Sequence, residues 1–155
     1  MDSLKIKNTN IDLLIPLIKE CLEKDNSVTL TPYGNSMLPM MNGGKDTVTI
    51  SKIKNKLKKY DLPLYVRNNG QYVIHRIVGI KNGCYVCIGD NMFSCECDVK
   101  DSMIIGIVTS FTHNRKHYRT DCLSYRIYCV IWDQSRFFRR CIRKLATLIK
   151  YNTGD

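Results

Sequence analysis

Two glycine-containing turns constrain the fold of this 155-residue chain more than any other feature. Asn68-Asn69-Gly70 and Lys81-Asn82-Gly83 each separate two segments rich in β-branched and aromatic residues, which is the pattern of a β-hairpin with glycine where a positive φ is needed. Similar short apolar segments lie on either side of these hairpins. The expected strands are 27–33, 46–50, 60–67, 71–80, 84–88 and 103–111. The sequence therefore predicts a mainly β fold.

Two helices are expected to flank this β region. Apolar residues recur at helical spacing over 11–24, after Asn10 as the N-cap, and Pro16 is expected to separate an irregular first turn from the regular helix. We expect this helix to pack on the β domain, with a position on a membrane surface as the alternative. The expected division is an N-terminal helix (1–26), a β catalytic domain (27–112), and a basic linker with an amphipathic helical tail (113–155).

The positive charge of the chain is concentrated near its C-terminus. The net charge is +10, and residues 113–155 hold ten basic and three acidic side chains against fourteen and eleven in 1–112. Apolar and basic residues alternate at helical spacing over 123–150, a pattern typical of helices that lie on an anionic membrane. Packing of the apolar face on the β domain or on a partner is the alternative. Nucleic acid is not the expected partner.

Cysteine content and hydropathy favour a cytoplasmic location. The chain has eight cysteines, no apolar run near the ~18 residues of a membrane span, and no segment with the pattern of a secretory signal. Cys84-x-x-Cys87 and Cys95-x-Cys97 raise the alternative of a zinc site, but Cys84 and Cys87 would face opposite sides of a strand. Free structural thiols are therefore expected, and the basic tail favours a peripheral position at the cytoplasmic face of the membrane.

Two short stretches carry the groups that acyl transfer requires. Ser36 follows Gly34 on an expected turn, and His75 lies within an apolar segment. A serine hydroxyl is a weak nucleophile that becomes reactive beside a base whose pKa is near neutral, and histidine is such a base. The two residues are 39 positions apart, so only the fold can bring them together.

Three motifs in this region resemble those of one peptidase family. Gly34-Asn35-Ser36-Met37-Leu38-Pro39 resembles the G-x-S-M-x-P box of type I signal peptidases, a box that recurs more loosely in the self-cleaving repressors of the same superfamily. His75-Arg76-Ile77-Val78-Gly79 resembles the second box of the histidine-type members, and Gly89-Asp90-Asn91 resembles the G-D-N box. The resemblance covers residues 28–108 and implies a coiled or barrel-like antiparallel sheet.

The resemblance implies a serine endopeptidase that needs no metal or cofactor. Ser36 would attack the peptide carbonyl, and His75 would accept its proton. Some members carry a hydroxyl two residues before the nucleophile; Gly34 stands there, so the backbone N–H of Ser36 would hold the oxyanion. The substrate would be a precursor or leader peptide cleaved after small residues. Its groove is expected to include Gly34, Met37, Leu38 and Pro39.

An acidic side chain is expected to hold the imidazole of His75 and to stabilise its cation. Asp90 lies in the third box and is the first candidate. In the histidine-type members the acid is thought to lie a few residues beyond that box, where Glu96 and Asp98 stand. Asp98 is the second candidate.

Two other functions remain open. A non-catalytic module that binds a peptide or a membrane would keep its function after Ser36→Ala and lose it on removal of 122–155. A self-cleaving repressor would need a DNA-binding domain, but only 35 residues precede Ser36. The sequence does not specify the substrate or the oligomeric state.

Overall fold

The computed structural model describes residues 4–6 and 11–135 of the chain. In these ranges the elements are β1 (Leu4–Ile6), α1 (Ile11–Glu23), β2 (Val28–Leu30), β3 (Val48–Ser51), β4 (Pro63–Val66), β5 (Tyr72–Ile74), β6 (Arg76–Lys81), β7 (Cys84–Ile88), β8 (Glu96–Val99), a 3₁₀ turn (Asp101–Met103), β9 (Ile104–His113), β10 (Lys116–Arg119) and α2 (Leu123–Gln134). The mainly β fold predicted from the sequence is confirmed.

The strands form two open sheets. The larger sheet has the order β1-β2-β3-β9-β4-β5, with β10 also paired to β9, and the smaller has the order β6-β7-β8. Every pairing is antiparallel except β1 with β2, which is parallel. The finer expectation of a coiled or barrel-like antiparallel sheet is not confirmed, since the described strands form two sheets and no closed barrel.

The division between the sheets falls at His75. The sequence predicted one strand over 71–80, but the chain leaves the larger sheet after β5 and enters the smaller sheet with β6, and His75 lies at the crossing point. The side chain of a residue at such a junction does not have to follow the alternation of either sheet. The two hairpins that flank this segment are confirmed, with positive φ at Gly70 and at Asn82 and Gly83.

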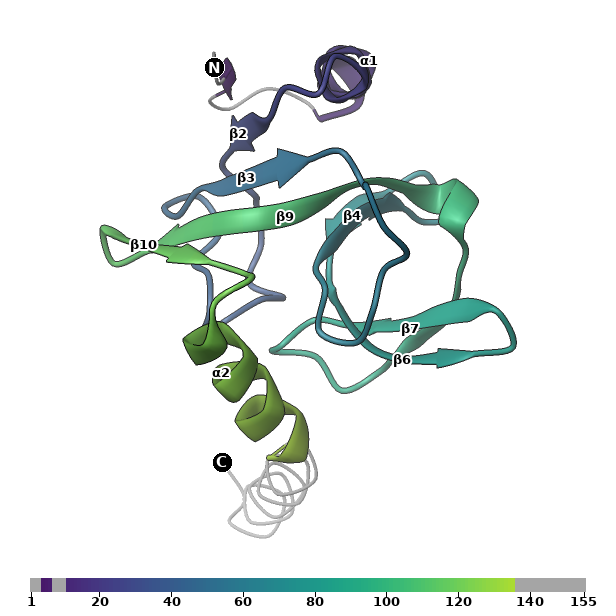
Figure 1. Ribbon diagram of the computed structural model, residues 1–155, viewed down its shortest axis with the longest axis vertical. Coiled ribbons are helices and arrows are strands. Elements are labelled where there is room, and N and C mark those ends of the chain that lie inside the picture. The colour runs from purple at the N-terminus through teal and green to yellow at the C-terminus, as the bar shows by residue number, and fades with distance from the viewer. Residues whose placement is uncertain (1–3, 7–10, 136–155) are drawn as a thin grey trace, which may run out of the picture.

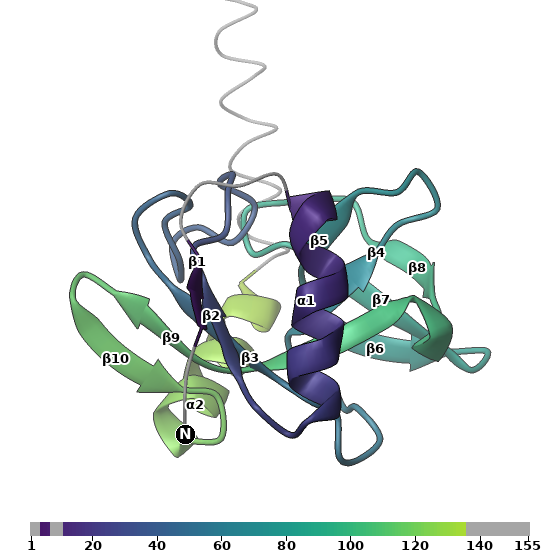
Figure 2. The same ribbon diagram turned by 90° about the horizontal axis from the view of Figure 1, so that it is seen from above.

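The larger sheet is covered on both faces (Figure 1). Helix α1 lies on one side, and the smaller sheet and α2 lie on the other. Figure 2 shows α1 from above, lying over the sheet. Its inward side chains Ile15, Ile18 and Leu22 are buried in the core, so the expected packing role of this helix is confirmed. The helix runs regularly through Pro16 instead of beginning there.

The segment predicted as a polar linker is a β-hairpin. Strand β9 extends to His113, Asn114 and Arg115 make the turn with positive φ, and β10 pairs back along β9. The side chain of His113 contacts the β3 side of the domain, where its Nδ1 lies 2.9 Å from Oδ2 of Asp46. Asparagine and other polar residues tolerate the left-handed conformation of tight turns. The basic residues of this segment led to the prediction of a linker, so the turn at Asn114 was missed.

Helix α2 packs into the β domain. Tyr125 and Cys129 on its inner face are buried beside Phe111, and the Tyr125 hydroxyl donates a hydrogen bond of 2.7 Å to the carbonyl of Tyr60. This inner side of α2 therefore belongs to the core, whereas Ile127, Val130 and Ile131 of the predicted apolar face are exposed. The predicted tail from 136 onward lies outside the described residues. Within 4–6 and 11–135, neither helix is long and apolar enough to cross a membrane.

Candidate active site

Ser36 lies on the loop between β2 and β3. Gly34 has φ +83°, a left-handed conformation that favours glycine, and it starts the turn that presents Ser36. Beneath the turn Met37 and Met41 are buried, and the backbone N–H of Met41 donates to the carbonyl of Met37 at 3.0 Å. The buried Met37 and Met41 therefore anchor the turn in the core, while Ser36 lies on the outer side of the turn.

The third motif supports the serine turn directly. The backbone N–H of Asn91 donates to the carbonyl of Ser36 at 2.8 Å, and its side-chain amide donates to the carbonyl of Asn35 at 3.2 Å. A Cβ at Gly89 would lie 2.6 Å from the Ser36 carbonyl oxygen, so only glycine allows this contact. Among the described residues the Ser36 N–H has no acceptor, which leaves it available for an oxyanion.

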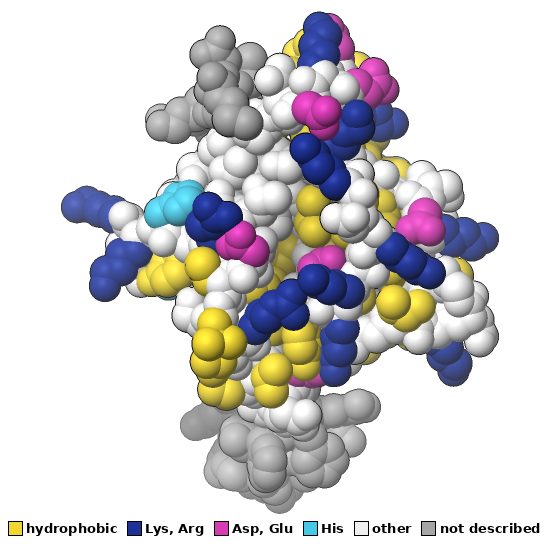
Figure 3. Space-filling view, viewed as in Figure 1, with side chains coloured by type: hydrophobic (Ala, Val, Ile, Leu, Met, Phe, Trp, Pro, Cys, Tyr) yellow, Lys and Arg dark blue, Asp and Glu magenta, His cyan; other side chains and the backbone are white. Residues whose placement is uncertain are grey.

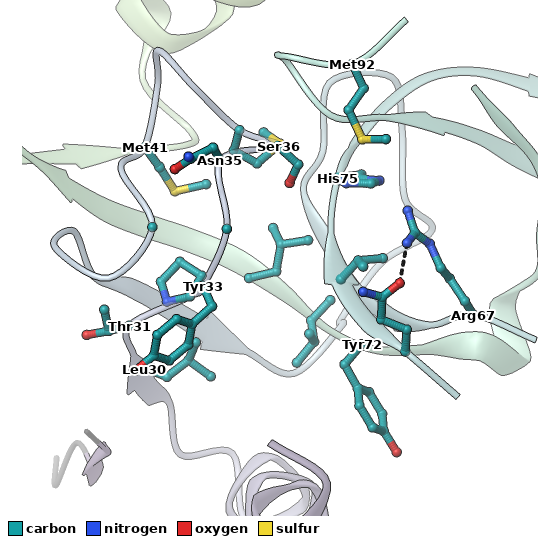
Figure 4. A pocket seen from close by; sticks show the side chains of 18 of the residues that line it. Leu30, Thr31, Tyr33, Asn35, Ser36, Met41, Arg67, Tyr72, His75 and Met92 are labelled. Atoms are coloured by element: carbon teal, nitrogen blue, oxygen red, sulfur yellow. Dashed lines mark hydrogen bonds between the residues drawn. The ribbon is translucent and has the colours of Figure 1, made fainter. Parts of the chain in front are cut away.

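Ser36 and His75 line the same cavity, which has a volume of about 910 Å³. Figure 4 shows Ser36 and His75 on opposite sides of the cavity, which Met92 also lines. Of the four residues expected in a substrate groove, Gly34 and Met37 line the cavity. Leu38 and Pro39 are not among the described residues that line it.

A buried polar network holds His75. The side chain is about 1% exposed, and its Nδ1 lies 2.9 Å from Oε1 of Glu96 and 3.2 Å from the hydroxyl of Tyr65. Arg67 donates two hydrogen bonds to the same carboxylate, from Nε to Oε2 at 2.9 Å and from Nη2 to Oε1 at 2.7 Å. A further hydrogen bond of 2.6 Å joins Arg67 to Gln71 (Figure 4). The histidine is therefore fixed by β4, β8 and the β4–β5 hairpin.

This network selects the tautomer that a general base needs. An ionised carboxylate only accepts hydrogen bonds, so the proton between His75 and Glu96 belongs on Nδ1. Nε2 then carries the lone pair. Burial lowers the pKa of His75, and the charge and hydrogen bond of Glu96 oppose that shift without cancelling it. Burial alone would raise the pKa of Glu96, but Arg67 and His75 bring it below its ordinary value. At neutral pH the pair is therefore a neutral imidazole beside a carboxylate.

The acids placed beside His75 from the sequence lie elsewhere. Asp90 is buried, and its two carboxylate oxygens accept hydrogen bonds from Arg76, at 2.8 Å from Nε and 2.7 Å from Nη2. Asp98 is exposed and accepts a hydrogen bond of 3.4 Å from the side chain of Asn68. The acid in contact with His75 is Glu96, which the sequence analysis named but ranked after Asp90 and Asp98. The expectation for Asp90 and Asp98 as partners of the imidazole does not fit this geometry.

Arg76 and Asp90 form a second buried centre next to the first. The Nη1 atom of Arg76 donates to the Tyr125 hydroxyl and to the Cys129 sulfur, both at 2.7 Å. The indole N–H of Trp132 donates to the carbonyl of Asp90 at 2.9 Å. The motifs at 75–79 and 89–91 therefore each contribute to two places in the fold. His75 lines the cavity and Asn91 supports the turn of Ser36, whereas Arg76 and Asp90 join the β domain to α2.

The acylation rate of Ser36 is expected to fall in acid with a midpoint below the ordinary histidine value of about 6.5. The reason is that protonated His75 cannot accept the serine proton, and burial lowers the pKa at which protonation occurs. The rate of adduct formation with a serine-directed probe, measured from about pH 4.5 to about pH 8, gives this midpoint. A midpoint above about 7 would contradict a buried, neutral base.

The cysteine pairs do not form a metal site in the described part of the chain. Within it no group of three or more histidine, cysteine, aspartate or glutamate side chains could hold a metal ion. Cys84 is half-buried, Cys87 is buried, and Cys95 and Cys97 are exposed, all as free thiols.

Comparison with models of protein families and with curated protein sequences finds no match to this chain.

Proposed function

We propose that the chain is a serine endopeptidase of the signal-peptidase type, in which Ser36 is the nucleophile, His75 the general base and Glu96 the residue that positions the base. One observation carries the proposal: Ser36 and a buried histidine line one cavity, and the histidine Nδ1 is held by a carboxylate at 2.9 Å. That arrangement matches the roles that a nucleophile, a base and an orienting acid take in acyl transfer.

The reaction follows from the protonation states. Oγ of Ser36 bonds to the carbonyl carbon of the substrate while its proton passes to Nε2 of His75, and Glu96 stabilises the imidazolium that forms. The backbone N–H of Ser36 donates to the oxyanion. The C–N bond then breaks as His75 returns the proton to the leaving amine. Water, deprotonated by the same imidazole, attacks the ester carbonyl and releases Ser36.

The substrate is proposed to be an extended precursor or leader peptide cleaved after a small residue, as the resemblance implies. The cavity is apolar where Leu30, Leu64 and Ile74 line it, and aromatic where Tyr33 and Tyr72 line it. Apolar clefts with few polar groups are typical of peptide and small-molecule sites. Because Gly34 and Met37 border Ser36 here, the residue before the scissile bond would lie against them.

Labelling with a fluorophosphonate probe tests the nucleophile. We expect wild-type protein to gain one covalent adduct on Ser36, and Ser36→Ala and His75→Ala to gain none, because the hydroxyl is unreactive without its base. Intact mass and peptide mapping identify the site. Ser94→Ala, which removes an exposed serine from the loop before β8, is the matched control and should label like wild type.

Two outcomes would contradict the proposal. One is a folded wild-type protein that gains no adduct, and the other is His75→Ala that labels as fast as wild type. Either would favour the non-catalytic binding module. Removing 122–155 is a poor test of that alternative, because it would take Tyr125 and Cys129 out of the core.

A further inference from the structure

The outer face of α2 presents a row of large apolar side chains. Their exposed fractions are 73% for Leu123, 50% for Ile127, 44% for Val130 and 62% for Ile131. Positions i, i+4, i+7 and i+8 lie on one side of a helix, opposite the buried Tyr125 and Cys129. Figure 3 shows hydrophobic side chains gathered over α2, with lysine and arginine side chains beside them. A row of exposed large apolar side chains bordered by charged ones is typical of an interaction surface.

The sequence after α2 continues the same pattern. Apolar residues recur there every three or four positions, and this spacing continues that of the exposed row and not that of the buried Tyr125 and Cys129. These apolar residues are Phe138, Cys141, Ile142, Leu145 and Ile149. The residues between them include Arg136, Arg139, Arg140, Arg143 and Lys144. Apolar residues on one side and cations on the other form the sequence pattern of helices that bind at a lipid–water interface.

We propose that the outer face of α2 binds the surface of an anionic membrane, with Leu123, Ile127 and Ile131 inserted at the boundary of the acyl chains. Charge decides between lipid and a second copy of the chain. A symmetric contact would bring together two copies of a chain whose net charge is +10, whereas anionic headgroups neutralise this charge.

The inner face of α2 keeps the helix on the β domain while the outer face is occupied. Lys59 pairs with Asp133 at 2.9 Å, and Trp132 donates to the carbonyl of Asp90. Binding therefore requires no opening of the core. This inference does not depend on the proposed peptidase activity, since no residue of the cavity takes part.

Co-sedimentation of the full-length chain with vesicles tests the surface. Vesicles of phosphatidylcholine alone and with about one third phosphatidylglycerol are compared at low and high salt. We expect binding only with the anionic lipid, weakened by salt. The double variant Ile127→Glu, Ile131→Glu should bind about tenfold more weakly or worse, because it places two carboxylates where apolar groups must enter the interface.

Two matched variants complete the experiment. Leu13→Glu changes a residue of α1 that is 71% exposed, and it should bind within about twofold of wild type. Ser36→Ala should bind like wild type, which separates this inference from the proposed function. Equal binding to neutral vesicles, or no loss in the α2 double variant, would overturn the proposal. So would a dimer in light scattering that the α2 double variant abolishes.

Discussion

Replacing Asp90 with asparagine is expected to lower the free energy of unfolding by roughly 3–5 kcal/mol. The change removes the negative charge that faces the guanidinium of Arg76, and both side chains are almost fully buried, at 1% exposed for Asp90 and 2% for Arg76. A buried cation without its partner is costly because no solvent replaces the lost interaction. Urea unfolding followed by the fluorescence of Trp132, the single tryptophan, measures the effect.

Two comparisons make this result specific. Asp98→Asn is the matched control, since Asp98 is exposed, and it should change stability by no more than about 0.5 kcal/mol. Arg76→Met combined with Asp90→Asn should cost less than the sum of the two single changes, because the double variant leaves no unpaired charge. An Asp90→Asn protein as stable as wild type, with an altered acid limb, would instead make Asp90 the partner of His75.

Replacing Glu96 with glutamine is expected to reduce the acylation rate by about 10³- to 10⁴-fold. The amide cannot satisfy both neighbours: if its oxygen faces His75, its NH₂ meets the Nε–H of Arg67 at the position of Oε2. If its NH₂ faces His75 instead, it donates to Nδ1 and forces the proton onto Nε2. In the first case the Nε–H of Arg67 loses its acceptor, and in the second Nε2 of His75 loses the lone pair that accepts the serine proton.

The pH profile separates this role from a merely structural one. Because Glu96 raises the pKa of His75, its neutralisation should move the acid limb of the residual activity to lower pH. The same probe and pH series apply, with a circular dichroism spectrum to verify folding. Asp98→Asn again serves as the control. A folded Glu96→Gln protein with the wild-type rate would show that the carboxylate does not position the base.

The sequence pointed to Ser36 and His75, which line one cavity, but it did not rank Glu96 first among the acids beside the imidazole. The turn before Ser36 and the apolar segment around His75 are strong local signals. Glu96 lies on β8, whose four residues include only one buried side chain, so no alternation marked it as a strand. Its partners Arg67 and Tyr65 come from another hairpin, and only the tertiary fold brings the three together. The signal in the sequence was the position of Glu96 a few residues beyond Gly89-Asp90-Asn91, where the resembled histidine-type members are thought to carry their acid.

The role of Asp90 was misread for a related reason. His75 and Arg76 are neighbours, and the side chains of neighbouring residues in an extended segment point to opposite sides. A carboxylate that contacts one of them therefore points away from the other. A buried arginine is always charged, so leaving it without a carboxylate costs more free energy than leaving a neutral histidine without one. The break between β5 and β6 could not be predicted from the sequence, because no glycine, proline or other turn residue marks it.

The buried centre around Arg76 also limits how this chain can evolve. Arg76, Asp90, Tyr125 and Cys129 share one set of hydrogen bonds, although they come from a strand, a loop and a helix. A single replacement leaves a charge or hydroxyl without its partner, whereas coordinated replacements keep the core neutral and filled. Descendants of this chain should therefore exchange these residues as a group, and α2 should be inherited with the β domain and not recombined as an independent module.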